Sequence, residues 1–251
     1  MRRERTSVSQ EDYLKAIWEI VQEEQVPISA RLAEELGVTP PAVTAALKRM
    51  NRDGYLRVAR EGRIQLTSKG RTVAQHLVLR HRLAEKLLTE ILGLDWTRAH
   101  EEAERLEHGM SHEVVSLLLQ RFGSESRCPH GVPLFGGLAK LRRRNAAVLL
   151  CDAQAGDRVE ILRVYEKDQK FLEFLTQLRL RPGARARVLN REYDETMTLQ
   201  VTGSPEDRVR RGGGRSKWTP RHPSRAKPRD IYLGKPATSR IWVCRLPRAG
   251  R

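Results

Sequence analysis

Apolar positions near the start of the chain recur with the period of an amphipathic helix. From Ser9 they follow one another at helical spacing as far as Val21, which predicts a helix that ends near Gln25. Ser9 is a suitable N-cap because its hydroxyl can accept a hydrogen bond from a backbone N–H of the first turn. Asp12 falls in that turn, where a carboxylate interacts favourably with the helix dipole.

The next stretch, residues 29–50, predicts two short helices joined by a tight turn. Gly37 suits the C-terminus of the first helix, and Thr39 caps the second, whose first turn accommodates Pro40 because no N–H is needed there. This pattern is a helix-turn-helix. Its predicted buried positions are Leu32, Ala33, Leu36, Val38, Val43, Leu47 and Met50.

Residues 55–67 alternate apolar and polar positions on either side of Glu61 and Gly62, which predicts a β-hairpin. Arg60 lies near its tip. A helix-turn-helix followed by a hairpin is a winged helix, and cations at the wing tip suit contact with DNA phosphates.

Helical patterning then continues to about residue 122. Thr67 begins a long helix that runs to about Leu92, and a second helix opens at Asp95 or Thr97 and is broken by Gly109. A third, from about Ser111, carries an excess of apolar residues, which favours a dimer interface. The basic stretch 140–145 is predicted to be a linker, and beyond it the period changes to two, with one helical insert at 171–178. The strands predicted there, at 157–164, 184–189, 196–201 and 240–243, form a small barrel.

The composition of the chain indicates a nucleic-acid partner. The chain has 47 Lys and Arg against 31 Asp and Glu, a net charge of +16, which favours binding to nucleic acid. The segment 208–229 is rich in Gly, Pro and Arg, and we interpret it as a mobile basic insertion in the barrel. We expect a cytoplasmic protein, because the chain has no signal-peptide pattern and no apolar run of the ~18 residues that a membrane span needs.

Histidines and glutamates indicate metal binding. His100, Glu104, Glu107 and His108 have the spacing of one face of an α-helix, and the pair at positions 81 and 85 repeats it. Imidazole and carboxylate together suit divalent transition metals. Each residue alone fits an ordinary solvated helix face. The four residues at 100–108, together with His81 and Glu85 on the preceding helical segment, favour a metal site. Cys128 and His130, two residues apart, form a further possible chelate.

Several motifs of the chain together form a recognisable set. They are Ser7-Val-Ser-Gln-Glu-Asp-Tyr-Leu-Lys-Ala-Ile, the Pro-Pro-Ala-Val-Thr helix, Leu66-Thr-Ser-Lys-Gly, Arg80-His-Arg-Leu-Ala-Glu-Lys-Leu-Leu and Glu104-Arg-Leu-Glu-His-Gly-Met-Ser, with Ile231-Tyr-Leu-Gly and Ser239-Arg-Ile-Trp-Val as closing strands of the barrel. The set resembles the diphtheria-toxin-repressor family of metal-dependent transcriptional regulators, in its manganese-responsive branch with a C-terminal FeoA-type domain. The resemblance covers residues 7–140 most strongly.

The resemblance implies a mainly α fold with a small β domain. The expected parts are a winged helix-turn-helix at 1–74, a helical metal-binding and dimerisation domain at 75–140, a linker at 141–150, and an SH3-like barrel at 151–251 that carries the insertion at 208–229.

It also implies two metal sites. The first consists of Asp12, Glu104, Glu107 and His108. The second uses His81, Glu85 and His100, or a manganese-type version with Cys128 and His130, completed by a ligand from the barrel, Glu166.

Two departures from the iron-type pattern favour Mn(II), with Fe(II) as the alternative. Asp12 and Glu104 stand where that branch has Met and Cys, and carboxylate-rich sites suit manganese. Lys15 stands where the short manganese-dependent members have an additional glutamate, which argues against a two-metal cluster of their type.

The predicted function is a metal-activated, homodimeric repressor of manganese or iron uptake genes, not an enzyme, that binds a palindromic operator in double-stranded DNA. The residues predicted to contact DNA are Ser29, Arg31, Thr39, Pro40, Pro41, Thr44, Lys48, Arg49 and Arg60. A di-metal enzyme and a metal-buffering protein are the alternatives, since His/Glu clusters also serve both.

Overall fold

The computed structural model describes residues 7–203 and 229–247. The basic segment predicted at 208–229 therefore lies outside the described residues, apart from Arg229. The chain divides into two compact units. The first comprises Met1–Gly93, Glu101–Ser126 and Leu134–Ala139, and the second comprises Leu94–His100, Arg127–Pro133 and Lys140–Arg251. No helix among the described residues is long and apolar enough to cross a membrane.

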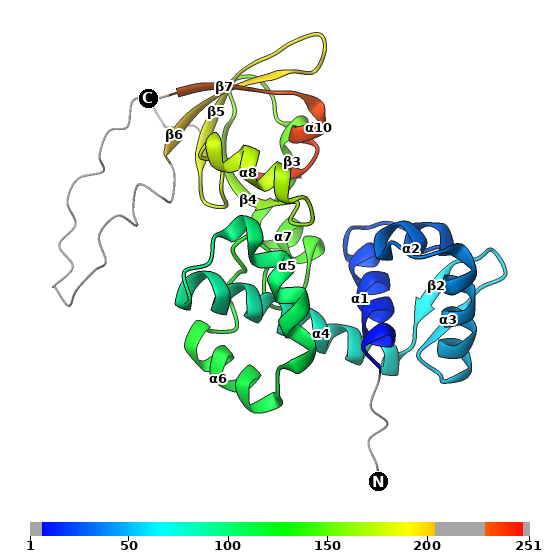
Figure 1. Cartoon of the computed structure of the whole chain (residues 1–251). Coiled ribbons are helices and arrows are strands. Elements are labelled where there is room, and N and C mark those ends of the chain that lie inside the picture. The colour runs from blue at the N-terminus through cyan, green and yellow to red at the C-terminus, as the bar shows by residue number, and fades with distance from the viewer. Residues whose placement is uncertain (1–6, 204–228, 248–251) are drawn as a thin grey trace. The chain divides into compact units, whose positions relative to one another are not determined.

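The first unit begins with the predicted winged helix. Helices α1 (Val8–Gln22), α2 (Ser29–Leu36) and α3 (Pro40–Arg52) precede an antiparallel hairpin of β1 (Leu56–Val58) and β2 (Ile64–Leu66), and these elements pack together (Figure 1). Gly37 ends α2 in the left-handed conformation and Thr39 occupies the N-cap of α3, as the sequence predicted. One apolar cluster joins the helices to the hairpin, with Leu14, Ile17, Leu32 and Met50 among its fully buried members.

Three details of this part differ from the prediction. The N-cap of α1 is Ser7, not Ser9, because Ser7 forms a reciprocal capping box with Gln10. The helix ends at Gln22, before Gln25, because Glu24 has a positive φ of 60°. Val38, predicted to be buried, is exposed beside the turn.

Helix α4 (Ser68–Lys86) follows the hairpin and continues into the π-helical turn η1 (Leu87–Ile91), which confirms the long helix predicted to about Leu92. Its start lies close to the wing: a side chain at Gly70 would place its Cβ 2.0 Å from the carbonyl oxygen of Tyr55. Helix α6 (His112–Phe122), capped by Ser111, packs against α4 around Leu83 and Ala84.

The predicted His/Glu stripe does not lie on one continuous α-helix. Helix α5 (Trp96–Leu106) stops before Glu107, and Glu107–Gly109 form the 3-10 turn η2. The change from α to 3-10 geometry rotates the side chains that follow. The four residues therefore do not share one face, as a continuous α-helix would require. Within the first unit, Glu107 is buried and Glu104 is exposed.

The second unit is built around a six-stranded antiparallel sheet with the strand order β3-β8-β4-β5-β6-β7. Its strands are β3 (Val148–Leu149), β4 (Arg158–Val164), β5 (Arg185–Arg191), β6 (Met197–Gly203), β7 (Arg229–Leu233) and β8 (Ile241–Leu246). Helix α8 (Gln169–Gln177) is the predicted insert, and α10 (Lys235–Thr238) and the 3-10 turn η3 (Leu150–Asp152) are short additions. Alternate strand residues and one face of α8 form the core, for example Val188, Leu199 and Leu172.

The stretch 140–145, predicted to be a linker, is instead part of helix α7 (Leu138–Asn145). Leu141 explains the difference, because it is buried in an apolar cluster with Ala147 and Leu162 of the second unit. Leu138 of the same helix is also buried, so a basic sequence can form an ordered helix when apolar residues anchor it.

Candidate metal centre

Within the first unit, α1 and η2 bring together three of the predicted ligands. The side chains of Asp12, Glu107 and His108 each offer one ligand atom, and these atoms lie within 4.8 Å of one another. His108 Nε2 is 3.0 Å from Asp12 Oδ1 and 3.7 Å from Glu107 Oε1. Two carboxylates and one imidazole at this separation fit a small divalent cation, so the residues present suit the metal that the sequence predicted.

Glu11 is a member of this group that sequence reasoning missed. Its Oε2 lies 2.8 Å from His108 Nδ1, on the side of the ring away from Asp12. A proton on Nδ1 donated to Glu11 leaves Nε2 as the basic nitrogen that faces Asp12 and Glu107, an arrangement common around metal-binding histidines. The signal available in the sequence was the adjacent acidic pair at positions 11 and 12.

Lys15, one turn after Asp12 on α1, is buried against the same carboxylate. Its Nζ donates to Glu107 Oε1 at 2.9 Å and to Glu107 Oε2 at 2.8 Å. His81 on α4 approaches Glu107 Oε2 with Nδ1 at 2.5 Å, and Lys15 Nζ lies 3.1 Å from the same ring nitrogen. Glu107 is therefore shared between His108 on its outer side and a buried pair, Lys15 and His81, on its inner side.

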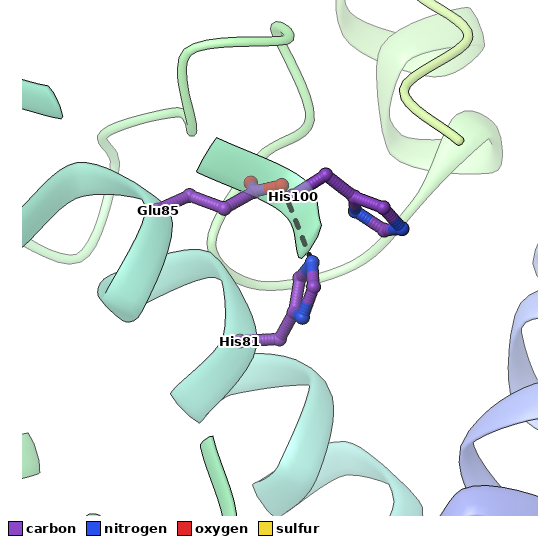
Figure 2. A group of neighbouring side chains, drawn as sticks. All are labelled: His81, Glu85 and His100. Carbon is purple, nitrogen blue, oxygen red and sulfur yellow. Dashed lines mark hydrogen bonds and ion pairs between the residues drawn. The ribbon is translucent and has the colours of Figure 1, made fainter. Parts of the chain in front are cut away.

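His81 continues this chain of contacts along α4. Its Nε2 pairs with Glu85 Oε1 at 3.2 Å, one turn further on, as Figure 2 shows. Both side chains are almost fully buried. Buried charges of this kind are stable only when they are paired, and here His81 lies between two carboxylates.

The charges in the cluster shift one another's pKa values. Burial and the Lys15 ammonium lower the pKa of His81, but the Glu85 and Glu107 carboxylates outweigh them, and the net pKa is raised above 6.5. Burial raises the pKa of Glu107, but its hydrogen bond to His81, and the charges of His81 and Lys15, outweigh burial and lower it below 4.5. Burial raises the pKa of Asp12 above 3.8, with a further contribution from Glu107, against the lowering by His108 and Lys15.

Glu104, the fourth predicted ligand of the first site, is not in the three-residue group. Its side chain is 55% exposed, and its Oε1 lies 3.9 Å from Lys15 Nζ. It lies on the last turn of α5 and borders the cluster, so its role as a ligand stays a prediction.

The candidate residues of the second site are divided between the units. His81 and Glu85 belong to the first, whereas His100, Cys128, His130 and Glu166 belong to the second. Within the second unit, ring centroids of His100 and His130 are 6.5 Å apart, and both Cys128 and His130 are buried. Glu166 accepts a hydrogen bond from Arg163 Nη2 at 3.3 Å.

His130 lies in a tight turn that is fixed to β4. Its Nε2 is 2.9 Å from the carbonyl oxygen of Trp96, and because a carbonyl can only accept, Nε2 carries the proton. A neutral His130 ring then has Nδ1 as its basic nitrogen, the tautomer that a metal ligand needs. The neighbouring Gly131 is required, since its φ is 93° and an added Cβ would lie 2.0 Å from the carbonyl oxygen of Leu162.

The predicted DNA-contacting residues lie on α2, α3 and the wing. Those on α3 and its N-cap, and Arg60 near the wing tip, are exposed, as the sequence predicted: Thr39, Pro40, Pro41, Thr44, Lys48, Arg49 and Arg60. Two others are partly buried: Ser29 begins α2, and Arg31 Nη1 donates to the carbonyl oxygen of Val26 at 2.5 Å. Their contacts with DNA stay predictions.

Comparisons with known proteins agree with this arrangement. Residues 5–63 match the iron dependent repressor N-terminal DNA binding domain, residues 67–136 match the iron dependent repressor metal binding and dimerisation domain, and residues 148–212 match the FeoA domain. The chain is 36% identical over 198 residues to the diphtheria toxin repressor of Corynebacterium diphtheriae, covering 75% of this chain and 87% of that protein. It is 41% identical over 126 residues to the iron-dependent repressor IdeR of Mycobacterium tuberculosis, covering 50% of this chain and 55% of that one.

Among solved structures, a manganese-dependent transcriptional repressor in complex with manganese is similar over 94% of this chain and all of its own, with 27% identity and a TM-score of 0.76. These relatives are repressors rather than enzymes, which removes the di-metal enzyme from consideration. The chain belongs to the diphtheria toxin repressor family of metal-dependent, DNA-binding transcriptional repressors, with a dimerisation domain and a C-terminal FeoA domain.

Proposed function

We propose that Mn(II) is the ion that activates this repressor, and that Asp12, Glu107 and His108 hold it. The observation that carries the proposal is the convergence of these three side chains, with ligand atoms within 4.8 Å of one another. Glu104, on the adjacent turn of α5, completes the set when its exposed side chain turns inward.

The donor types favour manganese over iron. Asp12, Glu107 and Glu104 offer hard carboxylate oxygens and His108 one nitrogen, with no sulfur in the set. Mn(II) binds most weakly in the Irving–Williams order, so it is best retained by carboxylate-rich sites that offer no soft ligand to its competitors. Fe(II) is the alternative, because the matched relatives include iron-dependent repressors.

The ligands connect the DNA-binding part of the first unit to its helical part. Asp12 lies on α1, which packs on α2 and α4, whereas Glu107 and His108 follow α5. Burial, and to a smaller extent the neighbouring Glu107 carboxylate, raise the pKa of Asp12 and disfavour its ionised form. A bound divalent ion supplies the positive charge that allows these carboxylates to approach, and α1 is then held in the position that presents α3 to DNA.

We further propose that a homodimer reads a palindromic operator near genes for uptake of the same ion. The dimerisation domain sets two copies of α3 apart by the distance between half-sites. The exposed Lys48 and Arg49 of α3 are available to phosphates and base edges, while Arg60 of the wing contacts the DNA backbone. The second ligand set, with His81, Glu85 and His100 or with Cys128 and His130, and with Glu166, is proposed as an additional site.

A selection of duplexes from a random pool in the presence of Mn(II) tests this function. We expect an enriched palindrome that the dimer binds in Mn(II), more weakly in Fe(II) under anaerobic conditions, and at background level in EDTA or Mg(II). His108→Ala should give no Mn(II)-dependent enrichment, while Arg105→Ala on the exposed face of α5 serves as the matched control. Equal binding in EDTA and in Mn(II) contradicts the proposal.

A further inference from the structure

The ammonium group of Lys15 is buried in the middle of the carboxylate cluster, with only 6% of the residue exposed. It contacts both oxygens of Glu107, the Nδ1 atom of His81 and, at 3.9 Å, Glu104. A lysine ammonium is strongly hydrated in water, so its burial is costly unless the protein supplies anionic partners. The cluster supplies them, and Lys15 therefore occupies a position with the coordination of a bound cation.

Glu107 divides this cluster into two halves. Its Oε2 is directed to Lys15 and His81, while its Oε1, which also accepts from Lys15, is the oxygen nearest to His108 Nε2, at 3.7 Å. The inner half thus contains a cation that is part of the chain. The outer half, with Asp12 and His108, is the proposed metal site.

We propose that Lys15 is a tethered cation that fills the inner half of the cluster, so that the outer half takes one divalent ion and takes it with reduced affinity. The proposal rests on the proposed function, since it concerns the affinity of that same site. Two cations that share one carboxylate repel each other, and a group tied to α1 cannot diffuse away when the ion arrives. Lys15 therefore sets the ion concentration at which the repressor responds and limits this cluster to one ion.

The repulsion predicts the direction of each substitution. Lys15→Met keeps the length and the burial of the side chain and removes only its charge, so Mn(II) should bind about tenfold more tightly or better. Lys15→Glu replaces the cation by a carboxylate beside Glu107 and His81, and should bind one more Mn(II) per chain than the wild type. Lys15→Arg retains the charge and should retain the wild-type affinity and stoichiometry.

Isothermal titration of the full-length dimer with Mn(II), together with metal content after equilibrium dialysis, measures both quantities without DNA. Circular dichroism establishes that each variant is folded, and Lys15→Gln replaces Lys15→Met if the latter does not fold. Wild-type affinity in the neutral variant, or no additional ion in Lys15→Glu, overturns the proposal. If instead the wild type binds Mn(II) no better than His108→Ala does, the proposed metal site itself is wrong, so the two failures are distinguishable.

Discussion

The two sets of candidate ligands differ in how the chain assembles them. Asp12, Glu107 and His108 all belong to the first unit, where α1 and η2 both pack against α4 and bring the three side chains together. The second set takes His81 and Glu85 from the first unit, and its remaining members from the second unit. A site within one unit is largely organised before the ion binds, which lowers the cost of binding there. We expect the first group of ligands to determine the metal concentration at which the repressor responds, and the second group to modify that concentration.

We expect the largest effect from removal of Glu107, the buried carboxylate of the first set, and a much smaller one from removal of the exposed Glu104. Glu107→Ala leaves the buried Lys15 and His81 without their common anion, so the free energy of unfolding should fall by about 3–5 kcal/mol. Mn(II)-dependent binding to operator DNA should also be lost. Glu104→Ala should change stability little, because its side chain is 55% exposed. Urea denaturation and fluorescence anisotropy measure the two quantities, and equal losses of stability in both variants would falsify the distinction.

A change of donor atoms in the first set should change the preferred metal. In the double variant Asp12→Met with Glu104→Cys, softer sulfur replaces two carboxylate oxygens, and activation should shift from Mn(II) towards Fe(II), Co(II) or Zn(II). Anisotropy on operator DNA across these metals gives the order. An unchanged order means that these two positions do not determine the selectivity.

Much of the fold, and the types of residue in the candidate site, could be predicted from the sequence. The helix-turn-helix followed from Gly37 and the cap at Thr39, because local backbone geometry determines both. The sheet of the second unit followed from its period of two. The ligand types and the family also followed, since they depend on residue identity.

What the sequence could not show depends on contacts between distant residues. The pairing of Lys15 with Glu107 spans 92 positions and that of Glu11 with His108 spans 97, so no local pattern reports either. The end of α5 at Leu106 was missed because the residues that follow it have ordinary helical propensity. Helix α7 was missed because two buried apolar residues, Leu138 and Leu141, stabilise it against its basic composition.

Removal of a ligand from the second unit should have a smaller effect than removal of Glu107. In His130→Ala, Mn(II) stoichiometry should fall while the tightest binding event, assigned to the first set, remains. Operator binding should still require Mn(II), at a somewhat higher concentration, because the first set is intact. Titration calorimetry tests this, with His112→Ala on α6 as a control for loss of a histidine elsewhere. Complete loss of the response would place the controlling site in the second set.

Within the first set, Glu11 should act through His108 and not as a main ligand. Glu11→Gln keeps a hydrogen-bond acceptor near Nδ1 but removes its charge, so Mn(II) affinity should fall by about tenfold, the scale of such indirect ligand effects. Glu11→Asp, with a shorter carboxylate, should recover part of the loss. Wild-type affinity in Glu11→Gln would show that the contact at 2.8 Å does not orient the ring during metal binding.

The smallest effect concerns the inner half of the cluster and is seen without metal. The pKa of His81 is raised above 6.5 in the folded protein, because the Glu85 and Glu107 carboxylates outweigh burial and Lys15. The protonated ring therefore stabilises the fold fully below pH 6.5, and this contribution is lost as the pH rises through the raised pKa. We expect the free energy of unfolding in EDTA to decrease from pH 6.5 upward, and His81→Gln to lack that decrease. The acid side behaves oppositely: Glu107, with its pKa below 4.5, stabilises the fold above pH 4.5 and loses its contribution only in stronger acid. Urea titrations across this range measure both limbs, and an identical alkaline slope in wild type and His81→Gln would show that the ring is not the titrating group.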